Sequence, residues 1–302
     1  MTSTDKKNLW PSIWLAVLAT FIWSGNFIVA KAVNQSIAPV SLNFFRWLTA
    51  ALIIFPFAYQ QFKKEWPIVK RSWHYLFWIS LTGISLFNTF VYVGAHYTTA
   101  INLALIGTTS SPIMSIIFAR IFLKERIGLL KMGGLILCIT GVLFLLTKGD
   151  FHNLIKLEFG TGDLWVLLAA FCFSVYNTLV KKKPATISPF NFLFVIFSLG
   201  TLLMLPLFIW ETSSTPAIHW NVNLLIAIFY LGLGASVICF LIWNKAIQKL
   251  GAGRTSLFGN LIPIFSSVEA ALFLKEDFTW IHITSMLLVF AGIILANWQR
   301  RP

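Results

Sequence analysis

One apolar stretch near residue 90 carries four polar side chains on a single helical face. They are Ser85, Asn88, Tyr92 and His96, at relative positions 0, +3, +7 and +11. At 100° per residue, these positions fall within about 80° of one another on an α-helix. Such groups can bind an organic molecule through hydrogen bonds, or they can join neighbouring helices in the same way. The stripe therefore predicts either one wall of a binding cavity or an interhelical contact.

Polar and aromatic groups interrupt other apolar stretches as well. The stripe is repeated in the second half of the chain by Ser236, Cys239 and Trp243. A further predicted face holds Ser256, Asn260 and Ser267, at 0, +4 and +11. Polar or amphipathic groups in the middle of the first and sixth spans, together with Tyr92 and Trp243, predict an aromatic-lined, weakly polar pocket. Such a pocket suits flat or apolar organic molecules better than inorganic ions. The predicted binding residues are Trp23, Asn26, Asn88, Tyr92, Tyr176, Asn177, Trp243 and Asn260.

Opposite charges also stand within apolar stretches, at Arg46 and Glu269. At a rise of 1.5 Å per residue, both lie about 7–9 Å from the same side of the apolar layer. Isolated charges are costly in lipid, so we predict that the two pair. Two roles for the pair stay open. It either tethers its two helices, or it couples and gates, with Glu269 taking up a proton and releasing Arg46.

The motifs of several enzyme classes are absent from the sequence. It contains no GxxxxGK[ST] phosphate loop, no HExxH zinc motif and no GxSxG nucleophile elbow. The five histidines lack metal-ligand spacing. Cys138, Cys172 and Cys239 fall in apolar stretches, where cysteine usually fills a core. We therefore expect no enzyme activity, no metal and no cofactor.

Long apolar segments must position these side chains. Apolar residues make up 58% of the 302-residue chain and charged residues only 11%, against roughly 25% in an ordinary soluble domain. The apolar runs approach twenty residues, which suits about 30 Å of hydrocarbon, and backbone groups in lipid must be paired within the segment. We predict an all-α integral membrane protein with ten transmembrane helices. The predicted spans are 13–33, 40–59, 73–95, 100–123, 129–147, 162–182, 190–210, 221–244, 253–274 and 280–298.

The basic residues orient these spans. Of the 23 lysines and arginines, 17 fall on the side of the N-terminus, 4 fall on the opposite side, and Arg46 and Arg120 fall within spans. Basic residues accumulate on the cytoplasmic side of membrane proteins. We therefore predict that both termini are cytoplasmic. The net charge of +13 is then a consequence of topology, and we expect no nucleic-acid partner.

The two halves of the chain repeat one another. The stretch "IFLKER" at 121–126 returns as "LFLKED" at 272–277, and Pro112 and Pro263 show the same offset of 151 residues. An offset of 150 aligns the first two spans of each half, Pro39 with Pro189 among them. Because five spans is an odd number, the second half must enter the membrane inverted relative to the first. Inverted repeats of this kind are typical of secondary transporters.

The repeated pattern also resembles a known family. Each fourth span ends in a Leu-x-Glu phrase, a proline stands eleven residues before it, and "FFRWLTAALIIFPF" runs through the second span. Over nearly the whole chain this resembles the drug/metabolite transporter superfamily, specifically tandem EamA-type domains. The resemblance implies a ten-helix inverted-repeat carrier of amino acids, nucleobases or other metabolites, without nucleotide hydrolysis. It also implies an arginine at position 46. Lys124 and Lys275 depart from the family pattern, in which glycine is more usual.

The repeat and the resemblance together predict the organisation and the function. We expect a first five-helix repeat at 1–147, a linker loop at 148–161 and a second repeat at 162–302. The expected function is secondary transport of small organic metabolites across a bacterial plasma membrane by alternating access, in the direction of export. The expected partners are a small-molecule substrate and the lipid bilayer, and the expected state is a monomer or weak homodimer. The alternative is a membrane-embedded enzyme or scaffold.

We predict that a tag at either terminus is inaccessible from outside intact cells, because the termini share the side that carries 17 basic residues. A tag inserted at 147–163 is expected to be accessible. Labelling with a membrane-impermeant reagent before and after permeabilisation measures this. A C-terminal tag that reacts in intact cells would contradict the predicted orientation.

Overall fold

The computed structural model describes residues 3–33, 36–98, 100–125, 127–155, 160–274 and 279–298. Within these ranges the chain is almost entirely helical and has no strand. The helices of the first half are α1 (Ser3–Ala32), α2 (Pro39–Arg71), α3 (Trp73–Ser80), α4 (Phe87–Tyr97), α5 (Ala100–Leu123) and α6 (Leu129–Leu146). Those of the second half are α7 (Thr161–Lys181), α8 (Pro189–Ser214), α9 (Val222–Gly232), α10 (Cys239–Leu250), α11 (Ala252–Thr255), α12 (Leu261–Leu274) and α13 (Trp280–Asn297).

These helices form ten crossings, because three pairs each make up one crossing: α3 with α4, α9 with α10, and α11 with α12. Within the described ranges, seven crossings are long and apolar enough to span a membrane as single helical stretches, and Thr109–Leu123 of α5 is a shorter apolar helix. The predicted all-α class is therefore confirmed. The remaining crossings are α1, α5 and the α11–α12 pair.

Local breaks interrupt the α-helical winding at specific places. A π-helical turn, Leu81–Leu86, joins α3 to α4, and another, Leu233–Ile238, joins α9 to α10. These turns are equivalent in the two halves, and π-turns are frequent at functional sites. A 3₁₀-helical segment, Ser256–Asn260, separates α11 from α12. The corresponding helix of the first half, α5, is continuous.

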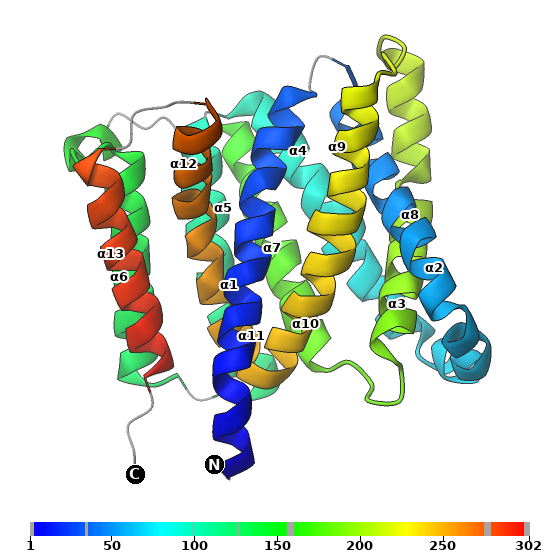
Figure 1. Cartoon of the computed structure of the whole chain (residues 1–302), viewed down its shortest axis with the longest axis horizontal. Helices are drawn as coiled ribbons and strands as arrows, with labels where there is room; N and C mark the ends of the chain where they lie inside the picture. The colour runs from blue at the N-terminus through cyan, green and yellow to red at the C-terminus, as the bar shows by residue number, and fades with distance from the viewer. Residues whose placement is uncertain are drawn as a thin grey trace.

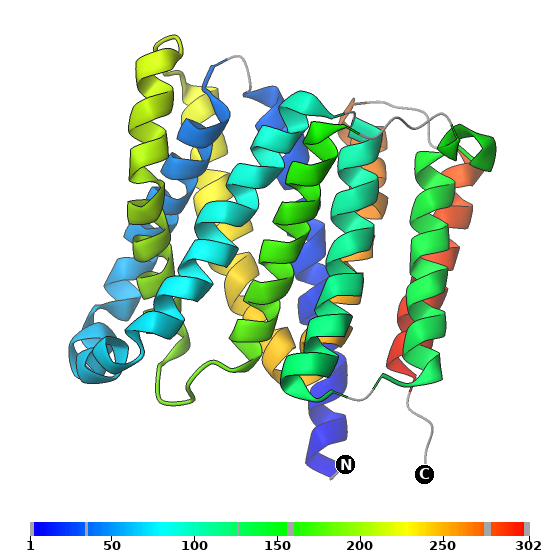
Figure 2. The same ribbon diagram turned by 180° about the vertical axis from the view of Figure 1, so that it is seen from behind.

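The two halves have opposite orientations. α1 and α7, the first helices of the halves, run in opposite directions through the bundle (Figures 1 and 2). The start of α1 and the end of α13 lie on the same side of it (Figure 1). This is the inverted arrangement that an odd number of crossings in each half requires.

The halves pack against each other more than within themselves. α1 packs against α10 and α12, and the equivalent helix α7 packs against α4 and α5. α2 packs against α8 and α6 against α13, and these two pairs lie at opposite edges of the bundle (Figure 1). Every pair therefore joins one half to the other, and the space between the two edges is shared by both halves.

Glycines bring α6 and α13 into backbone contact. A Cβ on Gly134 would lie 2.4 Å from the carbonyl oxygen of Gly292, and a Cβ on Gly292 would lie 2.6 Å from that of Gly134. At Gly141 the Cβ would lie 3.0 Å from the carbonyl oxygen of Ser285. Small residues allow such close approach between membrane helices. These glycines pack one half against the other.

Lys124 has a left-handed backbone conformation, which agrees with the glycine that the resemblance implies at this position. Its φ is 55°, in a region that costs roughly 1–2 kcal/mol for residues with a Cβ and little for glycine. Lys124 directly follows α5, so the unusual φ ends that helix. Lys275, the equivalent residue of the second half, lies outside the described ranges.

We predict that Gly134→Ala lowers the melting temperature of the purified protein, because the new methyl group would meet the backbone of α13. Overpacking of this kind costs about 1–3 kcal/mol. Gly133→Ala is the matched control: its Cβ would lie 3.4 Å from a flexible leucine methyl group, and alanine favours the helix. Equal melting temperatures for the two variants would contradict the proposed backbone contact.

Candidate functional site

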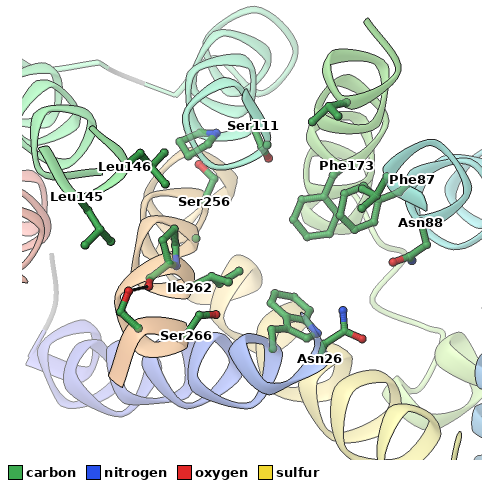
Figure 3. A pocket seen from close by; sticks show the side chains of 18 of the residues that line it. Asn26, Phe87, Asn88, Ser111, Leu145, Leu146, Phe173, Ser256, Ile262 and Ser266 are labelled. Carbon is green, nitrogen blue, oxygen red and sulfur yellow. Dashed lines mark hydrogen bonds between the residues drawn. The ribbon is translucent and has the colours of Figure 1, made fainter. Parts of the chain in front are cut away.

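A cavity of about 750 Å³ lies between the two halves. Residues of α1, α2, α4, α5, α7, α10 and α12 line it, together with residues near the end of α6 and the start of α13. Pro112 of α5 and Pro263 of α12, which are equivalent in the repeat, both belong to the lining. Figure 3 shows Leu145 and Leu146 at one end of this space and Asn88 near the other. The volume is that of a small-molecule site.

Aromatic rings form the central wall of the cavity. Trp23, Phe87, Phe173, Phe240 and Trp243 all line it. The rings of Trp23 and Trp243 have centroids 4.9 Å apart, and those of Phe87 and Phe173 stack at 4.5 Å. Phe87 and Phe173 stand together in Figure 3. A wall of this kind binds a flat apolar group by contact area.

Hydrogen bonds fix both indole rings of this wall. The Nε1 of Trp23 donates to the carbonyl oxygen of Ala235 at 2.8 Å. The Nε1 of Trp243 donates to Oδ1 of Asn177 at 3.0 Å. Both indole donors are thus bonded within the protein, and the rings hold their orientation in the wall.

Three of the predicted binding residues lie outside the cavity lining: Tyr176, Asn177 and Asn260. Tyr176 and Asn177 follow the lining residue Phe173 by about one helical turn, and both are fully buried. Tyr176 donates to Oδ1 of Asn244 at 2.7 Å, and Asn177 holds Trp243. The pair therefore supports the wall from behind, and neither side chain lines the cavity.

The local winding explains the position of Asn260. The predicted face assumed an α-helix, in which Ser256 and Asn260 differ by only about 40°. The segment is instead 3₁₀-helical, with about 120° per residue, which turns Asn260 about 120° away from Ser256. Ser256 lines the cavity, whereas Asn260 is fully buried and donates to the carbonyl oxygen of Leu257 at 2.9 Å.

The other five predicted binding residues do line the cavity: Trp23, Asn26, Asn88, Tyr92 and Trp243. Their part in binding stays a prediction. His96, the fourth residue of the predicted stripe, has its side chain outside the described part of the chain. Ser85, the first, points away and donates to the carbonyl oxygen of Gly200 at 2.9 Å, which bonds α8 to the π-turn.

Arg46 brings the only guanidinium of the described lining to the cavity. Its Nε donates to Oγ of Ser236 at 2.8 Å, and its Nη2 donates to the carbonyl oxygen of Ala235 at 3.1 Å. Its Nη1 lies 3.3 Å from Oδ1 of Asn26 and 3.5 Å from Oδ1 of Asn88. The guanidinium also lies 4.8 Å from the centre of the neighbouring Trp47 ring. All these partners are uncharged.

The predicted pair of Arg46 with Glu269 is wrong. Within the described residues, no carboxylate oxygen lies within 4.0 Å of Arg46. Glu269 instead accepts a hydrogen bond from Oγ of Ser24 at 2.7 Å. Ser24 and Asn26, which contact the two charges, are about 200° apart on α1. The sequence predicted similar depths in the membrane for the two charges, but it could not predict that helix α1 stands between them.

The apolar lining residues were not foreseen from the sequence. Phe87, Phe173 and Ile262 line the cavity, yet an apolar residue that lines a cavity looks the same in a sequence as one that fills a core. One pattern could have indicated Phe173, because an offset of 150 aligns it with Trp23. Lys148 and His282 were missed because they lie at the ends of crossings and reach the cavity only through packing.

We predict that cysteine at position 266 reacts with a small hydrophilic thiol reagent, whereas cysteine at position 115 does not. The two serines are equivalent in the repeat, but Ser266 lines the cavity and Ser115 is fully buried. Both variants are made in a protein whose three native cysteines, Cys138, Cys172 and Cys239, are replaced by alanine. Labelling of the purified protein is followed by mass spectrometry. Faster labelling at position 115 than at position 266 would contradict this cavity.

Comparison with known proteins agrees with this architecture. The EamA-like transporter family matches residues 10–147 and 160–298. The uncharacterized transporter YyaM of Bacillus subtilis is 25% identical over 95% of this chain and 93% of its own length. An uncharacterized transporter of Archaeoglobus fulgidus is 24% identical over 94% and 96%, respectively. One solved crystal structure, 16% identical, has a TM-score of 0.76 over 95% of this chain and 96% of its own, which shows the shared fold. The chain belongs to the EamA-like transporter family.

Proposed function

We propose that this protein is a secondary transporter of small organic metabolites, such as amino acids or nucleobases, in the plasma membrane. Substrate would bind in the cavity between the two halves and cross by alternating access. Family membership and relatives that are named transporters support the transport function. Export is the direction that we expect.

The observation that carries this proposal is a cavity between the two halves whose lining extends to one side of the bundle. Its lining includes Lys148, which follows α6 and is exposed, and Thr279, which precedes α13. In the predicted topology this is the external side. Bound substrate would therefore exchange with the outside in this conformation.

Several hydrogen bonds lie on the opposite side, and one of them joins the two halves. The carboxylate of Glu125, in the repeated Leu-x-Glu phrase, accepts a hydrogen bond from the backbone N–H of Ala252 at 3.2 Å and lies 3.5 Å from Nζ of Lys131. Lys181 donates to the carbonyl oxygen of Gln248 at 2.5 Å, and Gln248 donates back to the carbonyl oxygen of Val180. Moving the two halves apart on this side requires the bond between Glu125 and Ala252 to break. An inverted repeat offers a route, because either half can adopt the arrangement of the other.

Glu269 is the candidate for coupling transport to protons. Its side chain is 7% exposed, and its Oε2 is buried without a hydrogen-bond partner in the described part of the chain. Ser24, which donates to Glu269, accepts a hydrogen bond at its carbonyl oxygen from the cavity residue Ser266 at 3.3 Å. Tyr230 is the titratable neighbour: a Cβ on Gly25 would lie within 4 Å of both Tyr230 and Glu269. An acid within a membrane-spanning helix that stands next to a cavity is a candidate proton carrier.

Counterflow in proteoliposomes tests the transport function. Vesicles loaded with one unlabelled amino acid or nucleobase are expected to accumulate the same labelled compound transiently and saturably. The panel covers both classes of compound. Absence of counterflow for the whole panel would reject these substrate classes, and chemical conversion of a compound would favour the membrane-enzyme alternative.

We predict that Glu269→Gln abolishes accumulation driven by an imposed pH gradient but preserves counterflow, because exchange of substrate requires no net proton movement. Glu65→Gln is the matched control. Its carboxylate accepts hydrogen bonds from Ser188 and Asn191 at the α2–α8 edge, away from the cavity. Gradient-driven accumulation that is unchanged in Glu269→Gln would exclude the coupling role.

A further inference from the structure

Arg46 combines a buried positive charge with a place in the cavity lining, and this combination leads to an inference about the substrate. We propose that Arg46, Asn88 and Tyr92 form a binding subsite for a carboxylate group of the substrate. The inference rests on the proposed transport function and deepens it. The substrate would be an organic anion with a flat apolar body.

The charge of Arg46 is solvated by the protein but not neutralised. Its side chain is 3% exposed, and its hydrogen-bond partners are two amides, one hydroxyl and one backbone carbonyl, all of them neutral. An unpaired charge at this depth is costly, and the low local dielectric strengthens its attraction to any anion that reaches it. A substrate carboxylate would supply the counter-charge that the described protein groups do not.

Two further groups beside Arg46 offer unused hydrogen-bond donors. The Oδ1 of Asn88 faces Arg46, so the amide nitrogen Nδ2 is directed elsewhere. That Nδ2 and the hydroxyl of Tyr92 are buried without a partner in the described part of the chain. Both residues line the cavity, and they stand one helical turn apart on α4. Unpaired buried donors cost free energy, and an acceptor such as a carboxylate oxygen would satisfy them.

The charges around the cavity have one sign. Among the described lining residues, Arg46 and Lys148 are cationic and none is a carboxylate. Glu269 is close to the cavity but lies on the other face of α1, where Ser24 binds it. A positive lining attracts and concentrates anions in a low-dielectric cleft.

The fold does not require these polar groups. The offsets of the repeat align Arg46 with Ile196, Asn88 with Cys239 and Tyr92 with Trp243. In the second half, the fully buried Ile196 takes the structural place of Arg46 and packs without any polar partner. If Arg46 served packing alone, an aliphatic residue would serve equally well. The polar cluster is thus specific to one half, as expected of a site that binds one end of an asymmetric ligand.

The neighbouring wall defines the rest of the ligand. Trp23, which lines the cavity together with Asn26, stands against Trp243 and Phe173. A carboxylate held at Arg46 would therefore carry its body along aromatic rings. A bare inorganic anion would leave most of the 750 Å³ and these rings without contact.

Protection of a cavity cysteine tests the subsite. The purified Ser266→Cys protein, with its native cysteines replaced by alanine, is labelled in the presence of sodium 3-phenylpropionate, naphthalene-2-carboxylate or hexanoate. The primary amide of each acid is the uncharged isostere, 3-phenylpropylammonium chloride is the cationic probe, and sodium chloride controls for ionic strength. We expect at least one of the two aromatic carboxylates to protect at about a tenfold lower concentration than its amide.

Variants then assign the effect to named residues. Asn88→Asp would place a carboxylate next to Arg46 and neutralise it within the fold, so the half-protecting concentration of the carboxylate should rise about 10- to 100-fold. Tyr92→Phe removes one donor and should raise it about 2- to 10-fold. Tyr75→Phe is the matched control, because its hydroxyl donates to the carbonyl oxygen of Leu179 outside the cavity lining. This control substitution should leave the half-protecting concentration of the carboxylate unchanged.

The outcomes separate this inference from the transport proposal. Equal protection by carboxylate and amide, protection by sodium chloride alone, or an unchanged carboxylate preference in Asn88→Asp would overturn the subsite. Absence of protection by every carboxylate would overturn it as well. Protection by amides or by the amine alone would leave the cavity as a binding site and reject only its charge preference. The counterflow experiment in proteoliposomes tests the transport function independently of all these protection results.

Discussion

Each half of this chain completes its packing only against the other half, and the cavity depends on that constraint. In lipid, helices gain little from burying apolar surface, so close backbone approach and polar contacts must hold them together. Gly134 and Gly292 provide such an approach between α6 and α13. At the opposite edge, the carboxylate of Glu211 on α8 accepts hydrogen bonds from the backbone N–H groups of Val40 and Ser41 at the start of α2. The cavity occupies the space between these two edges, and both halves contribute to its lining.

The position of α1 decides how the two deep charges can act. Ser24 on one face of this helix binds Glu269, and Asn26 on the opposite face accepts a hydrogen bond from Arg46. A direct ion pair would have neutralised both groups and left neither for ligand or proton. Separation leaves the cation next to the cavity and the acid with one oxygen unpaired in the described part of the chain. The proposed anion subsite and the proposed proton site both depend on this separation.

The architecture is symmetric, but the chemistry is not. Both halves share equivalent π-turns and equivalent prolines beside the cavity. The charges are confined to single copies, because Arg46 aligns with Ile196 and Glu269 with Phe118. Alternating access requires similar conformations of the two halves, which a shared backbone pattern supplies. Recognition of an asymmetric molecule requires different side chains at its two ends, so divergence between the repeats is expected at the cavity.

The sequence by itself determined the helices, their number and the inverted repeat, because long apolar runs, an odd number of crossings and repeated prolines depend on local composition alone. The sequence also identified five residues of the cavity lining, because polar or amphipathic groups within apolar helices must avoid lipid. These residues are Trp23, Asn26, Asn88, Tyr92 and Trp243. Only the tertiary structure decided two other features. One is the 3₁₀ winding that buries Asn260. The other is the position of α1 between Arg46 and Glu269. A helical periodicity gives the angle and the depth of a side chain along one helix. Which helices stand side by side, and where the winding changes, depends on contacts between residues more than a hundred positions apart.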